Sequence, residues 1–107
     1  MRTLFTSIDE ADRLRAQAGK LYGEFLRVPT MSAGLYVLVV GATDTQGPHH
    51  EDEVYHVIRG LARFRAGEDD CAVAAGSVLF VAAEVEHHFY DVTEELALLV
   101  FFAPPET

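Results

Sequence analysis

Histidines are the residues of this sequence best suited to chemistry, because they cluster. All five lie between His49 and His88, and four of them form the adjacent pairs His49-His50 and His87-His88. Imidazole nitrogens act as acid–base groups and are the commonest metal ligands in proteins. Cys71 is the only cysteine, so an intrachain disulfide and sites with several thiolates are excluded. Any metal must therefore be held by histidine and carboxylate.

A carboxylate stands at a suitable spacing from the first histidine pair. His49 and Glu53 are four residues apart, and in an extended segment residues of equal parity project from the same face. In the second pair, His87 enters a predicted strand directly from a turn. Both histidine pairs therefore depend on strands for their position.

The elements that must position these residues are short strands. From Lys20 onward, β-branched and aromatic residues are interrupted at short intervals by Gly, Pro and Asp, which predicts an all-β sandwich or barrel. The expected strands span residues 21–26, 34–40, 54–58, 62–65, 77–81, 87–91 and 96–103. The expected turns lie at residues 28–29, 43–48, 66–70, 82–86 and 92–95.

One short helix precedes the strands. Ser7 at the N-cap and Glu10 three residues later form a capping box, and the apolar spacing predicts a helix from Ile8 to about Ala18. A chain of 107 residues fits one domain. Within it we distinguish an N-terminal helix and leading strand, residues 1–33, from a barrel, residues 34–107.

The charge of the chain excludes several classes of partner. Seventeen acidic residues against eight basic ones give a formal charge of −9, so no positive field attracts nucleic acid or anionic lipid. No window approaches the ~20 apolar residues of a membrane span, and the N-terminus lacks the apolar core of a signal peptide. We expect a cytoplasmic protein with neither a nucleic-acid nor a membrane partner.

Two of the expected strands are apolar at both parities. Residues 35–40 and 96–102 do not alternate between apolar and polar side chains, so both faces of each strand should be buried. The barrel interior covers one face, and the N-terminal segment or a second subunit could cover the other. We therefore expect a homodimer.

The two histidine pairs lie in a pattern that resembles the cupin superfamily. Its first motif runs Gly, five residues, His-x-His, three or four residues, Glu, six residues, Gly, and the residues on that spacing here are Gly41, His49, Glu53 and Gly60. Its second motif runs Gly, five residues, Pro-x-Gly, two residues, His, three residues, Asn, and Gly76 and His87 match it. The resemblance is to small bacterial single-domain cupins and covers residues 34–104. It implies a jelly-roll β-barrel with the site at its mouth.

The chain departs from both cupin motifs. The replaced positions are Gly47 for the first histidine, Ala82 and Glu84 for the second motif's Pro and Gly, and Asp91 for its Asn. His49, Glu53 and His87 remain. The resemblance implies that these three residues hold one divalent transition metal, which could be iron, manganese, nickel or zinc, with open coordination positions.

Four further residues have alternative interpretations. His50 could replace the missing histidine if the Gly47-Pro48 turn rotates the chain, whereas in a regular strand it points away from His49. Tyr55 and Phe89 share parity with Glu53 and His87 and are either pocket lining or core. Asp91 lies four residues after His87, where it either orients a ligand imidazole or merely ends a strand.

The function that the resemblance implies is a metal-dependent, dioxygenase-like enzyme acting on a small organic molecule in the barrel pocket. Two histidines and one carboxylate leave up to three positions on an octahedral metal, enough for substrate and dioxygen together. A metal-dependent isomerase, a non-catalytic module that binds a small ligand, and a structural relic without metal remain open, so the sequence leaves catalysis itself undecided. It does not identify the substrate.

Overall fold

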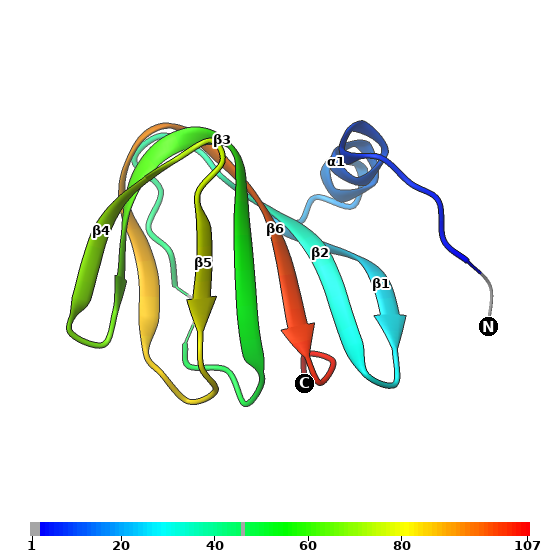
Figure 1. Cartoon of the computed structure of the whole chain (residues 1–107). Coiled ribbons are helices and arrows are strands. Elements are labelled where there is room, and N and C mark those ends of the chain that lie inside the picture. The colour runs from blue at the N-terminus through cyan, green and yellow to red at the C-terminus, as the bar shows by residue number, and fades with distance from the viewer. Residues whose placement is uncertain (1–2, 46) are drawn as a thin grey trace.

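The computed structural model describes residues 3–45 and 47–107 and contains one helix and six strands (Figure 1). The elements are α1 (Ile8–Gln17), β1 (Tyr22–Val28), β2 (Met31–Leu38), β3 (Asp52–Ala66), β4 (Asp69–Ala74), β5 (Val78–Val81) and β6 (His87–Ala103). All strand pairings are antiparallel, in the order β1-β2-β6-β3-β4, with β5 paired to β3. The expected all-β fold with one short N-terminal helix is confirmed.

The long strands β3 and β6 form an arch that makes both walls of the barrel. They pair from Asp52 opposite Ala103 to Ala66 opposite His87. The first part of β3 also pairs with β5, and its last part pairs with β4. In Figure 1 this ribbon rises, bends at the top and descends, so that the beginnings of β3 and β6 both lie at the lower, open end.

The arch bends where the sequence predicted breaks between strands. The register of β3 on β6 shifts between Val57 and Arg63, and Gly60 has a φ of +104°. A Cβ at Gly60 would lie 2.3 Å from the carbonyl oxygen of Glu95, so only glycine allows this close crossing. The predicted turn at 92–95 and the division of β3 at Gly60 are therefore wrong, because bulges bend the strands without ending them.

Strand β4 was missed by the sequence prediction. It begins at Asp69, inside the segment assigned to a turn, and it pairs from Ala66 opposite Asp69 to Leu61 opposite Ala74. Its acidic start, Asp69-Asp70, has the composition of a loop. The pairing with β3 overrides that local preference.

The helix α1 covers part of the outer face of the sheet. Its predicted cap is confirmed, because the Ser7 hydroxyl accepts a hydrogen bond of 3.1 Å from the Glu10 amide. Ala11 packs against the outward side chains of Leu35, Val37 and Ala97. The N-terminal segment therefore supplies cover for the doubly apolar strands. Because β1 pairs with β2, the division proposed at residue 33 falls inside this hairpin.

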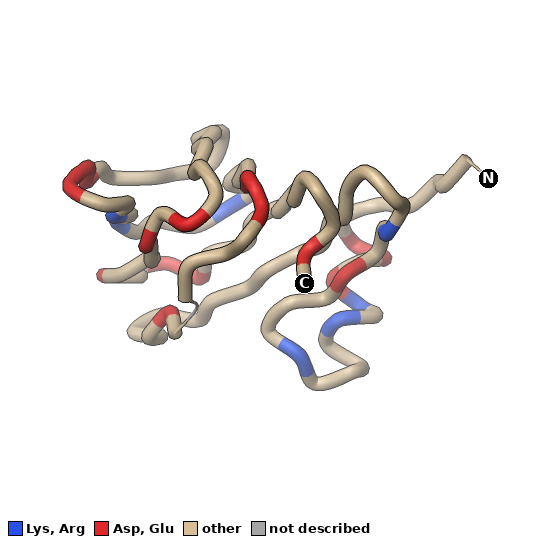
Figure 2. The backbone as a smooth tube through the Cα atoms, turned by 90° about the horizontal axis from the view of Figure 1, so that it is seen from below, with Lys and Arg blue, Asp and Glu red and all other residues tan. Residues whose placement is uncertain are grey.

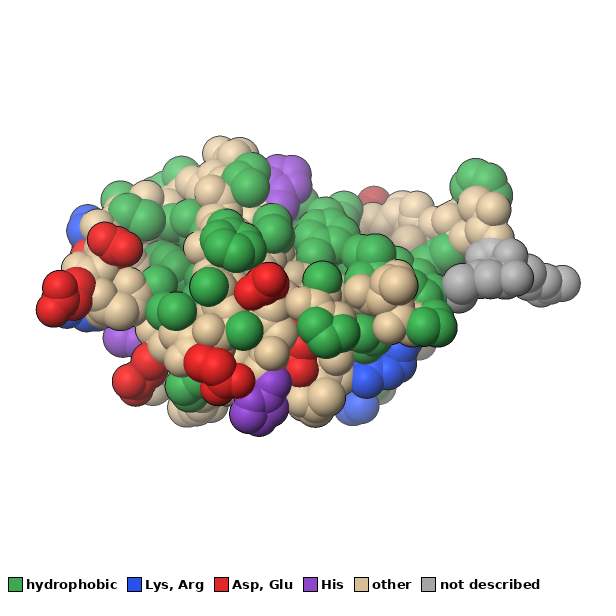
Figure 3. All heavy atoms as spheres, turned by 60° about the horizontal axis from the view of Figure 1, so that its bottom comes forward, with side chains coloured by type: hydrophobic (Ala, Val, Ile, Leu, Met, Phe, Trp, Pro, Cys, Tyr) green, Lys and Arg blue, Asp and Glu red, His purple; other side chains and the backbone are tan. Residues whose placement is uncertain are grey.

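The barrel interior holds the main core. Its fully buried side chains come mainly from β3 and β6, and the largest include Tyr55, Phe89, Leu96 and Leu98. Among the described residues, no helix has the length and hydrophobicity needed to cross a membrane. Figure 2 shows that Asp and Glu positions outnumber Lys and Arg positions and are spread over several parts of the backbone. Figure 3 shows that hydrophobic side chains also remain on the surface that includes the open end.

Candidate metal site

The three predicted ligands come from separate segments that meet at the open end of the arch. Glu53 is the second residue of β3, and His87 is the first residue of β6. His49 lies in the loop before β3, where its carbonyl accepts a hydrogen bond of 2.7 Å from the Glu84 amide. Asp44 anchors the same loop, because its carboxylate accepts hydrogen bonds from the Tyr36 hydroxyl and the Phe89 amide. These hydrogen bonds attach the loop to β2, to β6 and to the turn before β6.

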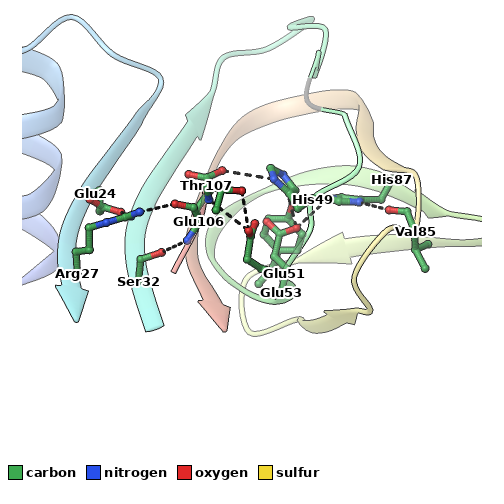
Figure 4. A network of polar contacts seen from close by, with 11 residues as sticks. Glu24, Arg27, Ser32, His49, Glu51, Glu53, Val85, His87, Glu106 and Thr107 are labelled. Carbon is green, nitrogen blue, oxygen red and sulfur yellow. Dashed lines mark hydrogen bonds and ion pairs between the residues drawn. The ribbon is translucent and has the colours of Figure 1, made fainter. Parts of the chain in front are cut away.

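These segments bring one ligand atom from each of His49, Glu53 and His87 within 4.8 Å of one another. Glu53 Oε1 lies 2.9 Å from His87 Nε2 and 3.9 Å from His49 Nε2 (Figure 4). The side chains of His87 and Glu53 are each 1% exposed, and that of His49 is 17% exposed. The sequence prediction for the cluster agrees with this placement.

A hydrogen bond from Nδ1 to the backbone fixes the orientation of the His87 ring. Nδ1 lies 2.8 Å from the Val85 carbonyl and donates to it, so the neutral ring has a lone pair on Nε2. The Tyr55 hydroxyl lies 3.0 Å from Nε2. Burial on its own lowers the pKa of His87, but the Glu53 carboxylate and the Val85 carbonyl outweigh burial and raise the pKa. The metal-free site therefore favours a proton on Nε2.

Glu53 Oε1 provides the test of whether a metal fits. This oxygen is buried and, among the described residues, has no hydrogen-bond donor apart from the His87 ring facing it. At 2.9 Å, Nε2 of His87 and this carboxylate oxygen hold either a shared proton or, when the ring is neutral and unprotonated at Nε2, a metal ion that both atoms coordinate. Two imidazoles and one carboxylate suit a divalent transition ion. The residues present therefore fit such a metal.

A cavity of about 170 Å³ opens beside the cluster. Its lining residues are Tyr22, Tyr36, Thr45, His49, Glu53, Tyr55, Val100, Phe102 and Glu106. Tyr55 lines this cavity as expected. Phe89 does not, because its buried ring packs in the core against Tyr55 and Phe64. Its equal parity with His87 puts it inside the barrel, but deeper than the cavity.

Two further predicted site residues lie elsewhere. His50 is 76% exposed, and its Nδ1 lies 2.7 Å from Glu84 Oε1, so its side chain points away from the cluster. His50 therefore points away from His49, as expected for adjacent residues of an extended segment, and does not replace the missing histidine. Asp91 is exposed at a positive φ of 48°. Both nitrogens of His87 are engaged by Val85, Tyr55 and Glu53, so Asp91 does not orient that ring.

Sequence reasoning missed several residues of the cavity, among them Tyr22 and Glu106, whose polar groups face the site. The Tyr22 hydroxyl is buried and has no hydrogen-bond partner in the part of the chain that the structure describes. Burial together with the nearby carboxylate of Glu106 raises its pKa, so it remains a donor. Glu106 Oε2 lies 3.5 Å from His49 Nδ1, and burial raises the pKa of this carboxyl although His49 opposes the shift. Neither residue lies in a motif, and neither has a spacing that points to the site.

Comparison with known proteins identifies the family and agrees with the fold. A family model for the cupin domain matches residues 34–103, which contain both histidine motifs. The chain belongs to the cupin family. As in other cupins, its barrel is a jelly roll, so the expected fold and resemblance are confirmed.

This cupin is similar to proteins of several kinds. The uncharacterised protein SCO3923 of Streptomyces coelicolor is 46% identical over 100 residues, which span 94% of this chain and 95% of that protein. An RmlC-like cupin from Shewanella frigidimarina has a TM-score of 0.71 at 19% identity, over 78% of this chain and 74% of the other. The crystal structure of Fe(II) HppE has a TM-score of 0.65 at 16% identity, over 76% of this chain and 48% of the other. The two solved structures support the fold alone.

Proposed function

We propose that this cupin is a metal-dependent enzyme, dioxygenase-like in its chemistry, that acts on a small organic molecule in the cavity beside His49. One divalent transition metal is held by His49, Glu53 and His87. The observation that carries the proposal is the approach of their ligand atoms to within 4.8 Å around a buried carboxylate oxygen.

The ligand set leaves room for substrate. Two imidazoles and a carboxylate fill three positions of an octahedral ion, and His49 and Glu53 also line the cavity. The open positions would then face the cavity rather than the core. A bound divalent ion would supply a Lewis acid and, if it is iron(II), electrons for reaction with dioxygen. Iron is the first ion to test, because the HppE structure, which shares the fold, was solved in its Fe(II) form.

The volume and the lining of the cavity indicate the size and polarity of the substrate. The volume of about 170 Å³ is below the ~300 to 1,000 Å³ of pockets for drug-sized ligands, so the molecule is small. The Tyr22 hydroxyl can donate a hydrogen bond to a substrate oxygen, because no group within residues 3–45 and 47–107 accepts from it. The rings of Tyr22, Tyr36 and Phe102 give the cavity apolar walls.

Oxygen uptake tests the proposed chemistry. The chain is loaded with iron(II) without air, and oxygen is admitted with a panel of small diketones, thiols and catechols. We expect substrate-dependent uptake by the wild type and the His88→Ala variant, and none by His87→Ala. His88 is the matched control because it follows His87 but packs outward against Tyr90. Uptake no greater than that of His87→Ala across the panel would contradict dioxygenase activity.

The other functions that the sequence left open become outcomes of the same experiment. Conversion of a panel member without oxygen uptake would replace the dioxygenase with a metal-dependent isomerase. Tight binding of a panel member without conversion would replace the enzyme with a ligand-binding module. A homodimer and a cytoplasmic location complete the proposal, and the dimer is tested below by mass.

A further inference from the structure

His49 turns its two ring nitrogens towards two different carboxylates. Nε2 lies 3.9 Å from Glu53 Oε1, on the side of the ligand cluster, and Nδ1 lies 3.5 Å from Glu106 Oε2 (Figure 4). A histidine that binds metal through one nitrogen carries its proton on the other. A carboxylate at that proton fixes the tautomer and the orientation of the ring. Glu106 stands where such a carboxylate would act.

Glu106 is held in this position by its own backbone and by the next residue. Its amide donates a hydrogen bond of 2.9 Å to the Ser32 hydroxyl, and its carbonyl accepts one from the Arg27 guanidinium. The Thr107 amide and hydroxyl donate to Glu51 Oε2 at 3.3 and 2.9 Å. These contacts attach the segment to β1, to β2 and to the chain just before β3. The backbone that carries the Glu106 carboxylate is therefore held in place next to His49.

The same geometry separates Glu106 from the ligands themselves. Within residues 3–45 and 47–107, the cluster of ligand atoms within 4.8 Å consists of His49, Glu53 and His87. Glu106 approaches the opposite nitrogen of His49. Since Gly47 stands where the first motif has a histidine, the site has three protein ligands, and the orientation of each affects affinity strongly.

We propose that Glu106 is a positioning residue for metal binding, whose carboxylate accepts a hydrogen bond from His49 Nδ1 and so presents Nε2 to the metal. The proposal rests on the proposed function, because it concerns the same ligands. The separation of 3.5 Å is longer than a good hydrogen bond, and we expect it to shorten when Nε2 is coordinated.

Cobalt(II) titration of the full chain tests this role, because the visible bands of cobalt report ligand number as well as occupancy. We expect Glu106→Ala to raise the dissociation constant roughly 10- to 100-fold. Glu106→Gln, which keeps an acceptor oxygen, should raise it less. The control Glu95→Gln removes a surface carboxylate paired with Arg59 and should leave the constant unchanged. The cobalt bands of the saturated variants should match those of the wild type.

Two results of the titration would overturn the proposal. A dissociation constant of Glu106→Ala within twofold of the wild type would remove Glu106 from metal binding. Altered bands in saturated Glu106→Ala would make Glu106 a ligand rather than a positioning residue. A wild-type chain that binds no cobalt contradicts the proposed function itself, so the two failures are distinguishable.

The tautomer of His49 in the metal-free protein gives a second readout. Nitrogen-15 chemical shifts should place the proton on Nδ1 in the wild type and move part of it to Nε2 in Glu106→Ala. A proton on Nε2 of His49 in the wild type would contradict the proposed hydrogen bond. This measurement also shows whether the variant is folded.

Discussion

At the level of single residues, a proton and a metal ion compete for Nε2 of His87. The Glu53 and Val85 oxygens raise the pKa of His87 above 6.5 despite burial, so the metal-free ring is protonated at a pH where an ordinary histidine is neutral. Metal binding must displace this proton. We expect metal retention on dialysis to fall as the pH decreases through the raised pKa, and protons to be released on binding near pH 6.5. Retention that stays constant down to about pH 5 would argue against histidine ligation.

Two tyrosines of the cavity differ in what their hydroxyls contact. The buried Tyr22 hydroxyl has no hydrogen-bond partner among the described residues, whereas that of Tyr36 donates to Asp44 Oδ1 at 2.8 Å. We expect Tyr22→Phe to leave the free energy of unfolding unchanged or to raise it by up to ~1 kcal/mol. Tyr36→Phe should lower it by about 1–3 kcal/mol, because a buried carboxylate loses a donor. Urea denaturation of both variants checks this difference, and equal losses would contradict it.

The candidate ligands could be predicted from the sequence, but their supporting residues could not. The spacing of His49 and Glu53 fixes a common face in any extended segment, and the cupin motif adds His87. Glu106 depends on a contact between segments 57 positions apart in the sequence, which no local pattern encodes. Parity also predicted that Phe89 faces inward, but parity does not say how deep along the barrel a side chain lies.

At the level of elements, the arch of β3 and β6 depends on glycine at one crossing. Gly60 combines a φ of +104° with the backbone of Glu95 and Leu96 against its Cα. Gly41 has a φ of +76° but open space around it. We expect Gly41→Ala to lower the free energy of unfolding by ~1–3 kcal/mol, because the positive φ strains an alanine backbone. Gly60→Ala should lower it further or prevent folding. Chemical denaturation measures both losses. A Gly60→Ala variant as stable as Gly41→Ala would contradict this explanation of the bend.

Strand boundaries were harder to predict than strands, and the arch explains why. Gly60 and the polar residues 93–95 are typical of turns, yet β3 and β6 continue through them with shifts of register, which are bulges. That continuity is set by pairing between distant segments. It has a functional consequence, since the unbroken arch is what brings the starts of β3 and β6, and with them Glu53 and His87, to one end of the barrel.

At the level of the whole molecule, part of the outer surface lacks cover. The helix α1 packs on Leu35, Val37 and Ala97, but Val78 and Phe80 of β5 remain 67% and 66% exposed. Apolar surface in water costs about 25 cal/mol per Å². We propose that a second copy of the chain covers β5. The cover of the doubly apolar strands, from which the sequence predicted a dimer, is supplied at least in part by α1.

Light scattering at micromolar concentration tests the dimer. We expect a mass of about 24 kDa, twice the 11.8 kDa of the chain. Phe80→Asp should shift the mass towards that of the monomer, because it places a charge in the apolar contact. Phe5→Asp, at an exposed position before α1, is the control. A wild type of about 12 kDa would contradict the dimer and leave α1 as the cover of the sheet.

Counting metal ions per chain decides whether His49, Glu53 and His87 form a metal site. We expect elemental analysis of the purified protein, or of protein reloaded with a divalent transition ion and dialysed, to give one ion per chain. The adjacent-residue controls His50→Ala and His88→Ala should keep this ion, whereas His87→Ala and the double variant His49→Ala, His87→Ala should lose most of it. One ion per chain retained by the double variant would contradict the site, as would a wild type that binds none.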